Sequence, residues 1–250
     1  MDTSDTTVHG EVHNQLLPWL LGEAGDWTRW KGRATLPSRA QVLELAMWIS
    51  RPVPGHIMEF GVWKGYSTRV IRDELWRSKV WERRQRNKRI YACDSFEGLP
   101  ETYEHLPQGN FATPVPRLNG VRIVKGFFDK SLTPELAEEV GRVSFAHLDA
   151  DLYESTVTVL DWLTPLLGPG SLLLFDEFLG EDPAEAKAFV EWSERTGINT
   201  MLLGLFNREP SGGGGMTDRR ALFQVVGDTP ITKAPPLLPA RLRRKLASQW

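Results

Sequence analysis

The sequence predicts an α/β protein with a mainly parallel sheet, because short apolar segments of strand type alternate with helical ones. Four helical patterns lie between strands, at residues 66–80, 134–140, 153–167 and 183–195, and these supply the crossovers that parallel strands need. Only a glycine-rich segment separates the last two strands, which predicts an antiparallel hairpin at the edge of the sheet. The seven expected strands are residues 56–60, 89–93, 121–124, 143–148, 171–175, 198–206 and 220–226.

Two more helices are expected before the first strand. Residues 11–21 have a helical apolar pattern, and Ser38 is placed to cap a second helix that Pro52 and Pro54 would end. The sequence therefore predicts a helical N-terminal cap (1–54), an α/β domain (55–227) and a basic tail (228–250).

Composition and charge exclude several classes of protein. The chain has 250 residues, of which 41% are hydrophobic and 25% charged, with a net charge of −2. A chain of this length can form a full hydrophobic core. Basic residues do not outnumber acidic ones, which argues against bulk nucleic-acid binding. No apolar run approaches the ~20 residues of a membrane span, and no signal peptide is visible. Cys93 is the only cysteine, so an internal disulfide and a cysteine-built zinc site are excluded, and we expect the reducing cytoplasm.

A glycine turn follows the first strand. Gly61 and Gly65 allow the backbone to approach a ligand, and the next helix would present free N–H groups to an anion. Ser67 lies in the first turn of that helix, where it could bind a carboxylate. The spacing is neither that of a dinucleotide fingerprint nor that of a phosphate-binding loop. An ordinary strand–helix turn would have the same glycines.

An acid ends the second strand. Asp94 at this position could accept hydrogen bonds from both hydroxyls of a ribose, although an Asp that caps the loop is the alternative. Together, the turn and this acid describe a site for a nucleoside that carries a carboxylate tail.

Several motifs then resemble one family. Glu59-Phe-Gly-Val-Trp-Lys-Gly-Tyr-Ser-Thr68 resembles the first motif of class I S-adenosylmethionine-dependent methyltransferases. Asp94-Ser-Phe-Glu-Gly-Leu-Pro100, Gly126-Phe-Phe128 and His147-Leu-Asp-Ala-Asp-Leu-Tyr-Glu-Ser-Thr156 resemble the macrocin and mycinamicin sugar O-methyltransferases. The resemblance covers about residues 55–226 and implies the Rossmann-like class I methyltransferase fold, with helices on both faces of a seven-stranded sheet.

The resemblance also implies a cofactor site for S-adenosylmethionine. Glu59 and Gly61 would meet the methionine end, Ser67 its carboxylate and Asp94 the ribose, while Phe127 or Phe128 would lie by the adenine. The implied cofactor-binding residues are Glu59, Gly61, Gly65, Tyr66, Ser67, Asp94, Ser95, Phe127 and Phe128.

Three carboxylates end the fourth and fifth strands, and they form the expected metal site. Asp149, Asp176 and Glu177 would repel one another unless a cation lay between them, and oxygen-only ligands suit Mg²⁺. The metal-dependent O-methyltransferase families place a metal at these positions, usually with Asp or Asn where this chain has Glu177. The alternative is that these acids cap helices.

Three residues are candidates for catalysis: Asp149, Asp151 and His147. Asp151 could be the base or a substrate contact, or it could cap the next helix. His147 lies on the same strand face as Asp149 and is either a packed histidine or the base. Catechol-type enzymes have a Lys where this chain has Leu152, so a lysine base at this position is absent here.

The predicted function is Mg²⁺-dependent transfer of the S-adenosylmethionine methyl group to a hydroxyl of a sugar or glycoside. The N-terminal helices and a long loop (97–119) with four prolines would roof the acceptor. One alternative is methylation of a phenolic small molecule. Another is a metal-dependent glycosyltransferase, because Asp149-Ala-Asp151 is a D-x-D sequence.

We also expect a homodimer. The N-terminal region is rich in tryptophan, with Trp19, Trp27, Trp30 and Trp48, and exposed aromatic patches usually mark interfaces. The basic segments 69–89 and 228–250 are either solvated surface or a dock for an acidic partner.

Overall fold

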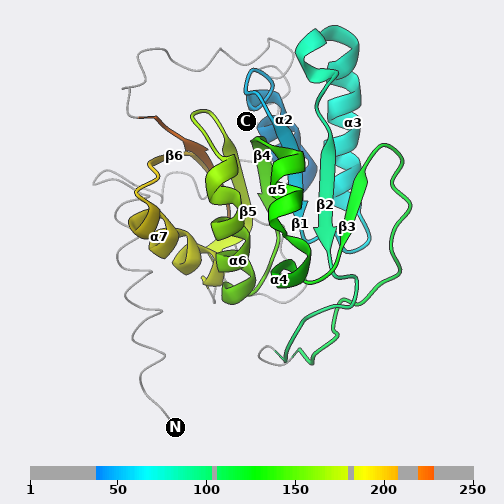
Figure 1. The fold of residues 1–250 in the computed structure, drawn as a ribbon, viewed down its shortest axis with the longest axis vertical. Helices are drawn as coiled ribbons and strands as arrows, with labels where there is room; N and C mark the ends of the chain where they lie inside the picture. Colours follow the sequence, from blue (N-terminus) through cyan, green and yellow to red (C-terminus); the bar gives the residue numbers. More distant parts are fainter. Residues whose placement is uncertain (1–37, 103–105, 180–182, 208–218, 228–250) are drawn as a thin grey trace, which may run out of the picture.

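The computed structural model describes residues 38–102, 106–179, 183–207 and 219–227, and these form a seven-stranded sheet in the order β3-β2-β1-β4-β5-β7-β6 (Figure 1). From β1 the chain moves outward to β2 and β3, and then returns to place β4 on the other side of β1. In open α/β sheets, ligands bind beside such a reversal, at the carboxyl ends of the strands. The strands are β1 His56–Phe60, β2 Ile90–Asp94, β3 Arg122–Lys125, β4 Val143–Leu148, β5 Leu172–Leu179, β6 Thr200–Asn207 and β7 Arg219–Val225.

The pairing of the strands confirms the predicted mixture of directions. The pairs β2–β3, β1–β2, β1–β4 and β4–β5 are all parallel. Strand β7 is antiparallel to both β5 and β6, so the last two strands form the expected hairpin at the edge.

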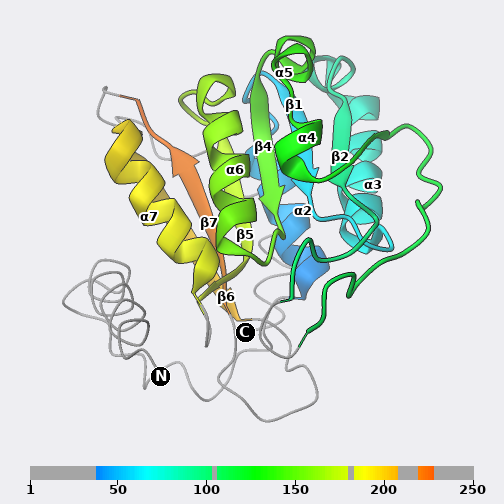
Figure 2. The same ribbon diagram turned by 60° about the horizontal axis from the view of Figure 1, so that its bottom comes forward.

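Helices cover both faces of the sheet, which gives three layers (Figures 1 and 2). Helices α2 (Arg39–Ile49) and α3 (Tyr66–Trp81) share one face, where their apolar residues pack on β1, β4 and β5. The opposite face carries α4 (Phe128–Ser131), α5 (Pro134–Val140), α6 (Tyr153–Leu163) and α7 (Ala184–Thr196).

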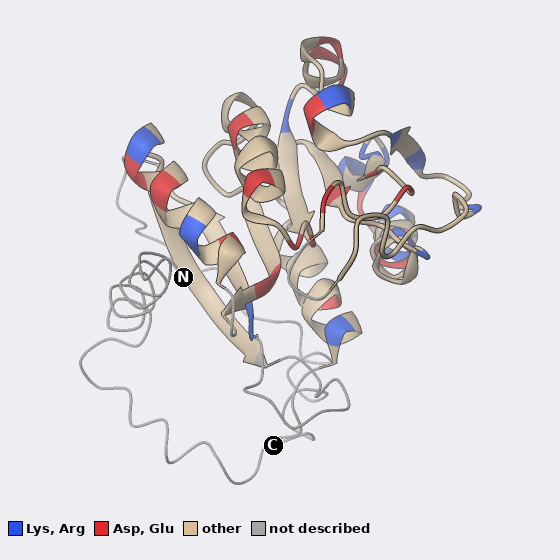
Figure 3. Ribbon diagram, turned by 90° about the horizontal axis from the view of Figure 1, so that it is seen from below, with Lys and Arg blue, Asp and Glu red and all other residues tan. Residues whose placement is uncertain are grey.

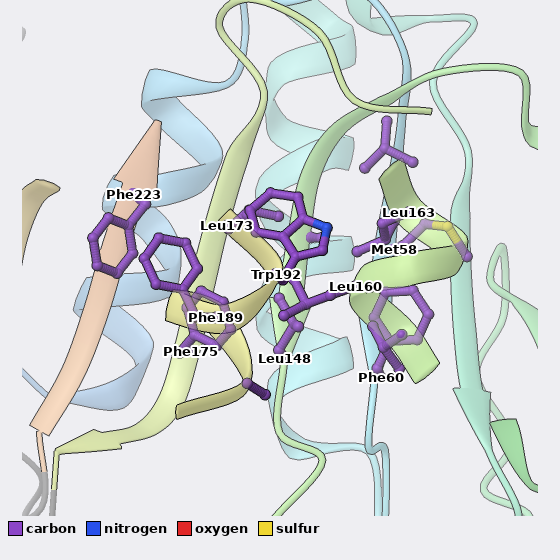
Figure 4. Close-up of a cluster of buried hydrophobic side chains, with 14 of the residues drawn as sticks. Met58, Phe60, Leu148, Leu160, Leu163, Leu173, Phe175, Phe189, Trp192 and Phe223 are labelled. Carbon is purple, nitrogen blue, oxygen red and sulfur yellow. The ribbon is translucent and has the colours of Figure 1, made fainter. Parts of the chain in front are cut away.

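Aromatic residues fill the core between β5, β7 and α7 (Figure 4). Phe189 of α7 stacks on Phe223 of β7, with 4.3 Å between ring centroids, and Phe175 meets both rings edge-on. Trp192 is 1% exposed, and its Nε1 donates to Thr164 Oγ1 at 2.9 Å. This packing fixes β5 and β7 against α7.

Local signals mark the starts of helices α2 and α5. Ser38 caps α2 in a capping box with Gln41, and Thr133 caps α5, which begins with Pro134. Helix α6 ends at Leu163 and continues as a 3-10 turn (Thr164–Leu166), where the sequence predicts one helix to residue 167.

Strand β5 and helix α4 also differ from what the sequence predicts, and two further predictions concern residues that the structure does not describe. Strand β5 runs to Leu179 rather than 175, because β7 continues to pair with it, and the short α4 is unpredicted. The expected helix at 11–21 and the tail at 228–250 lie outside the described residues. No helix in the described part of the chain is long and apolar enough to cross a membrane.

Candidate active site

A cavity of about 620 Å³ opens at the carboxyl ends of the parallel strands, at the predicted side of the sheet. Figure 3 shows this side from below, with acidic segments near its middle. Cavities of this size are typical of small-molecule sites. The loops after β1 to β5, with α2, α4 and α6, supply the lining: Arg39, Gly61, Val62, Trp63, Asp94, Ser95, Gly98, Leu99, Pro100, Phe111, Gly126, Phe127, Phe128, Asp129, Lys130, Asp149, Ala150, Asp151, Leu152, Glu154, Ser155, Thr158 and Glu177.

The glycine turn after β1 forms one wall. Gly61 has φ +88°, and a Cβ there would lie 1.9 Å from the carbonyl oxygen of Asp149. Glycine is therefore required because the turn crosses directly over the end of β4, a reason the sequence does not show. Gly65, with φ +76°, is the N-cap of α3.

Asp94 holds this turn in place. Its Oδ2 accepts hydrogen bonds from the backbone N–H groups of Val62 (2.7 Å) and Trp63 (2.8 Å), and its Oδ1 accepts one from Phe96 (2.7 Å). A carboxylate oxygen has two lone pairs, so these contacts engage Oδ2 fully and leave Oδ1 one further position. The described contacts thus leave room for one ribose hydroxyl rather than the two expected.

Backbone strain concentrates around the cavity. Of the four non-glycine residues with positive φ in the described ranges, Trp63 (+47°), Phe111 (+68°) and Asp151 (+57°) line it. Such conformations cost of order 1–3 kcal/mol each and cluster at functional sites. The rings of Trp63 and Phe111 meet edge-on, 6.4 Å apart, and both side chains are 47% exposed.

A buried histidine and glutamate lie behind the cavity. His147 Nδ1 is 3.1 Å from Glu59 Oε1, Thr68 donates to Glu59 Oε2, and both residues are 0% exposed. Burial lowers the pKa of His147, but Asp176 and Glu59 more than offset this and raise it to about 9. The imidazole is therefore charged at neutral pH and holds Glu59 by an ion pair.

Asp176 is surrounded by basic groups. Arg220 Nε of β7 donates to Asp176 Oδ1 at 2.5 Å, and His147 Nε2 is 3.7 Å from the same oxygen. Burial alone would raise the pKa of Asp176, but interactions with His147, Arg39 and Arg220 hold it well below its usual range. This carboxylate, 0% exposed, is therefore ionised inside the protein.

Arg39 connects α2 to the two strand-end aspartates. Its Nη2 donates to Asp149 Oδ2, and its Nε lies 3.3 Å from Asp176 Oδ1. Burial and the charge of Asp176 raise the pKa of Asp149, and Arg39 opposes this shift. No motif in the sequence connects Arg39 with these acids.

Glu185 is a second residue that the sequence does not single out. It lies in the first turn of α7, and its carboxyl accepts hydrogen bonds from the backbone N–H groups of Glu177 (2.9 Å) and Ala150 (3.3 Å). Burial, with the nearby Asp149, raises its pKa well above the ordinary value. In the sequence it is one more acid in a first helical turn, where acids are common.

The structure brings only some of the predicted site residues to the cavity wall. Gly61, Asp94, Ser95, Phe127, Phe128, Asp149, Asp151 and Glu177 line it. Glu59, Gly65, Tyr66, Ser67, His147 and Asp176 do not line it: Tyr66 is 56% exposed, and Ser67 is buried in the first turn of α3.

The expected Mg²⁺ site does not fit this arrangement. The described residues contain no group of three His, Cys, Asp or Glu side chains placed to hold a metal. Arg39 lies between Asp149 and Asp176, and Asp176 also meets Arg220 and His147. Asp149 Oδ2 and Asp176 Oδ1, two of the oxygens that a divalent cation would need, already face basic nitrogens, so we derive no chemical step through a metal.

Comparison with known proteins identifies the class. Residues 58–178 match a family model described as a methyltransferase domain. A tetracenomycin rhamnosyl 4'-O-methyltransferase of Streptomyces olivaceus is 31% identical over 150 residues, which cover 50% of this chain and 54% of that protein. Mycinamicin III 3''-O-methyltransferase of Micromonospora griseorubida is 29% identical over 175 residues, covering 60% and 65%. The chain thus spans between half and two thirds of these relatives.

Solved structures share the fold. The O-methyltransferase NovP has a TM-score of 0.57 at 21% identity, covering 76% of this chain and 80% of its own. The calicheamicin methyltransferase CalS11 has a TM-score of 0.56 at 21% identity, covering 90% and 93%. The strand order, the cavity and the family match over residues 58–178 agree on a methyltransferase domain with the class I fold.

Proposed function

We propose that this protein transfers the methyl group of S-adenosylmethionine to a hydroxyl of a sugar or glycoside. The observation that carries the proposal is the cavity between the ends of β1 and β4, where the strand order reverses. The glycine turn held by Asp94 forms one wall of this cavity, and the acidic end of β4 forms another. The relatives described above are named as O-methyltransferases, two of them for a rhamnosyl compound and mycinamicin III.

Asp94 and the aromatic residues after β3 would hold the cofactor. The remaining acceptor position on Asp94 Oδ1 suits a ribose hydroxyl, and Phe127 and Phe128 give the cavity an apolar wall for an adenine ring. When bound, S-adenosylmethionine supplies a methyl group already activated by its positive sulfur.

Asp151 is the base in this proposal. It lines the cavity two residues beyond Asp149, and its backbone is held at φ +57°, which is unfavourable for a residue other than glycine. As the acceptor oxygen bonds to the methyl carbon, the hydroxyl proton passes to the Asp151 carboxylate, while the electron pair of the breaking carbon–sulfur bond stays on sulfur.

Asp149 and His147 have supporting roles in this mechanism. His147 is fully buried, and its pKa of about 9 leaves it protonated, so it cannot take a proton at neutral pH. Asp149 lines the cavity with its carboxylate held by Arg39, which makes it a contact for the acceptor hydroxyl.

A methyl-transfer screen tests the function. Sugars, glycosides and phenols are incubated with S-adenosylmethionine, and release of S-adenosylhomocysteine is measured for each class. Turnover only with phenols would support the phenolic alternative. The glycosyltransferase alternative has less support, because its Asp149-Ala-Asp151 sequence lies within the matched methyltransferase domain.

A further inference from the structure

Arg39 reaches the acidic end of the sheet from outside the methyltransferase domain. It is the first residue of α2, which precedes the matched segment 58–178. Its guanidinium donates to Asp149 and lies 3.3 Å from Asp176, and the side chain lines the cavity with 27% of its surface exposed. A single cationic group therefore spans the two strand-end carboxylates.

The position of Arg39 is unfavourable for the helix itself. The first turn of a helix carries the positive end of its dipole, so a cation there is destabilising, and α2 has no acid in that turn to offset it. Burial also lowers the pKa of Arg39, yet Asp149 and Asp176 raise it above its ordinary value. The two aspartates, rather than α2, account for an arginine at this place.

Three acidic side chains of this cluster are each paired with at least one basic side chain. Three carboxylates, on Glu59, Asp149 and Asp176, contact three basic side chains, on His147, Arg39 and Arg220: Glu59 meets His147, Asp149 meets Arg39, and Asp176 meets all three. A divalent cation would add two positive charges and would have to displace Arg39 from Asp149. Separating the two partners of a largely buried ion pair leaves an uncompensated charge, which is unfavourable.

We propose that Arg39 is the resident cation of this cluster, which holds Asp149 and Asp176 together in the place of a divalent ion, and that the protein works without a bound divalent metal. Arg39 is then a positioning residue, because it fixes Asp149 at the cavity wall. Only the activity measurement below rests on the proposed methyl transfer.

The proposal predicts that removing the charge of Arg39 creates a metal site. Without the guanidinium, Asp149 and Asp176 repel each other, and oxygen ligands of this kind attract Mg²⁺ or Mn²⁺. Arg39→Gln removes the charge and keeps most of the stem, whereas Arg39→Lys keeps a cation. We expect Arg39→Gln to bind Mn²⁺ at least about tenfold more tightly than the wild type, and Arg39→Lys to resemble the wild type.

Calorimetric titration of the full chain with Mn²⁺, repeated with Mg²⁺, measures this directly. Arg51→Gln is the matched control, because Arg51 follows α2 and pairs with Glu74 and Glu82 away from the cavity. It should leave metal binding unchanged. Methyl transfer by the wild type should persist in EDTA.

Two results would overturn the proposal. One is stoichiometric metal binding by the wild type, with activity lost in EDTA. The other is equal, weak binding by the wild type and by Arg39→Gln, which would show that Arg39 is not what excludes the cation. If Arg39→Gln fails to fold, the wild-type titration alone decides. Failure to bind S-adenosylhomocysteine would remove the proposed function and leave the metal titration interpretable.

Discussion

Replacement of Asp94 by alanine should weaken cofactor binding and loosen the glycine turn together. The carboxylate accepts three backbone hydrogen bonds of 2.7–2.8 Å, two of them from the turn after β1. Hydrogen bonds to a charged group contribute about 1.5–3 kcal/mol each, and amides beside the open cavity recover part of this loss through water. We therefore expect the free energy of unfolding to fall by about 3 kcal/mol, the low end for the two turn bonds.

Cofactor affinity should fall by a separate amount. Loss of the ribose contact and of the fixed turn should cost about 2 kcal/mol, which is about 30-fold in Kd for S-adenosylhomocysteine. Asp94→Asn keeps one oxygen that can accept a hydrogen bond. Its NH₂ group, however, would point at a backbone N–H group, either of the turn or of Phe96. The loss of cofactor affinity should therefore be intermediate.

Calorimetry with S-adenosylhomocysteine and urea unfolding measure the two effects separately. Asp161→Ala is a suitable control, because that acid forms an exposed pair with Arg195 away from the cavity. An Asp94→Ala variant with a Kd within about threefold of the wild type would refute the reasoning.

Four further predictions follow from other parts of the molecule. Asp151→Asn should lower kcat by about 10²–10⁴ with S-adenosylhomocysteine affinity unchanged, and normal turnover would exclude it as the base. Lys88 donates to Ser50 and Ser144, and burial lowers its pKa to about 8. Above pH 8 the unfolded chain therefore binds more protons than the folded protein does. The free energy of unfolding should rise by about 3 kcal/mol from pH 8 to 10.5. Urea unfolding across this range should show the rise in the wild type and its loss in Lys88→Met. Gly61→Ala should fail to accumulate as folded protein, because its Cβ would overlap a backbone oxygen, and a native-like circular dichroism melt would contradict this. The expected homodimer is tested by light scattering at micromolar concentration, where a monomer mass would contradict it.

The sequence alone determined most of the secondary structure and the side of the sheet that carries the cavity. Strand β1, strand β4 and helix α5 lie at the residues that the pattern predicts, because short apolar segments, Pro134 and the capping Thr133 act within a few residues. The hairpin of β6 and β7 follows in the same way from the glycines between them.

The sequence also identified Asp94, but not its main contacts. An acid at the end of β2 is visible in the local sequence. Two of the backbone N–H groups that donate to it, however, belong to a turn 31 and 32 residues earlier. The same holds for Gly61, whose requirement for glycine comes from the carbonyl of Asp149 on another strand.

Only the tertiary structure decided which charges meet at the end of the sheet. Asp149 and Asp176 were expected to need a metal, because the sequence shows acids on neighbouring strands and no partner for them. Their partners Arg39 and Arg220 come from α2 and β7, at opposite ends of the described chain, and they reach the same carboxylate only because helix α2 packs on the sheet and β7 inserts beside β5. Electrostatic pairing depends on distance in space, and an ion pair formed across 44 or 137 residues of chain leaves no periodicity or spacing in the sequence to reveal it.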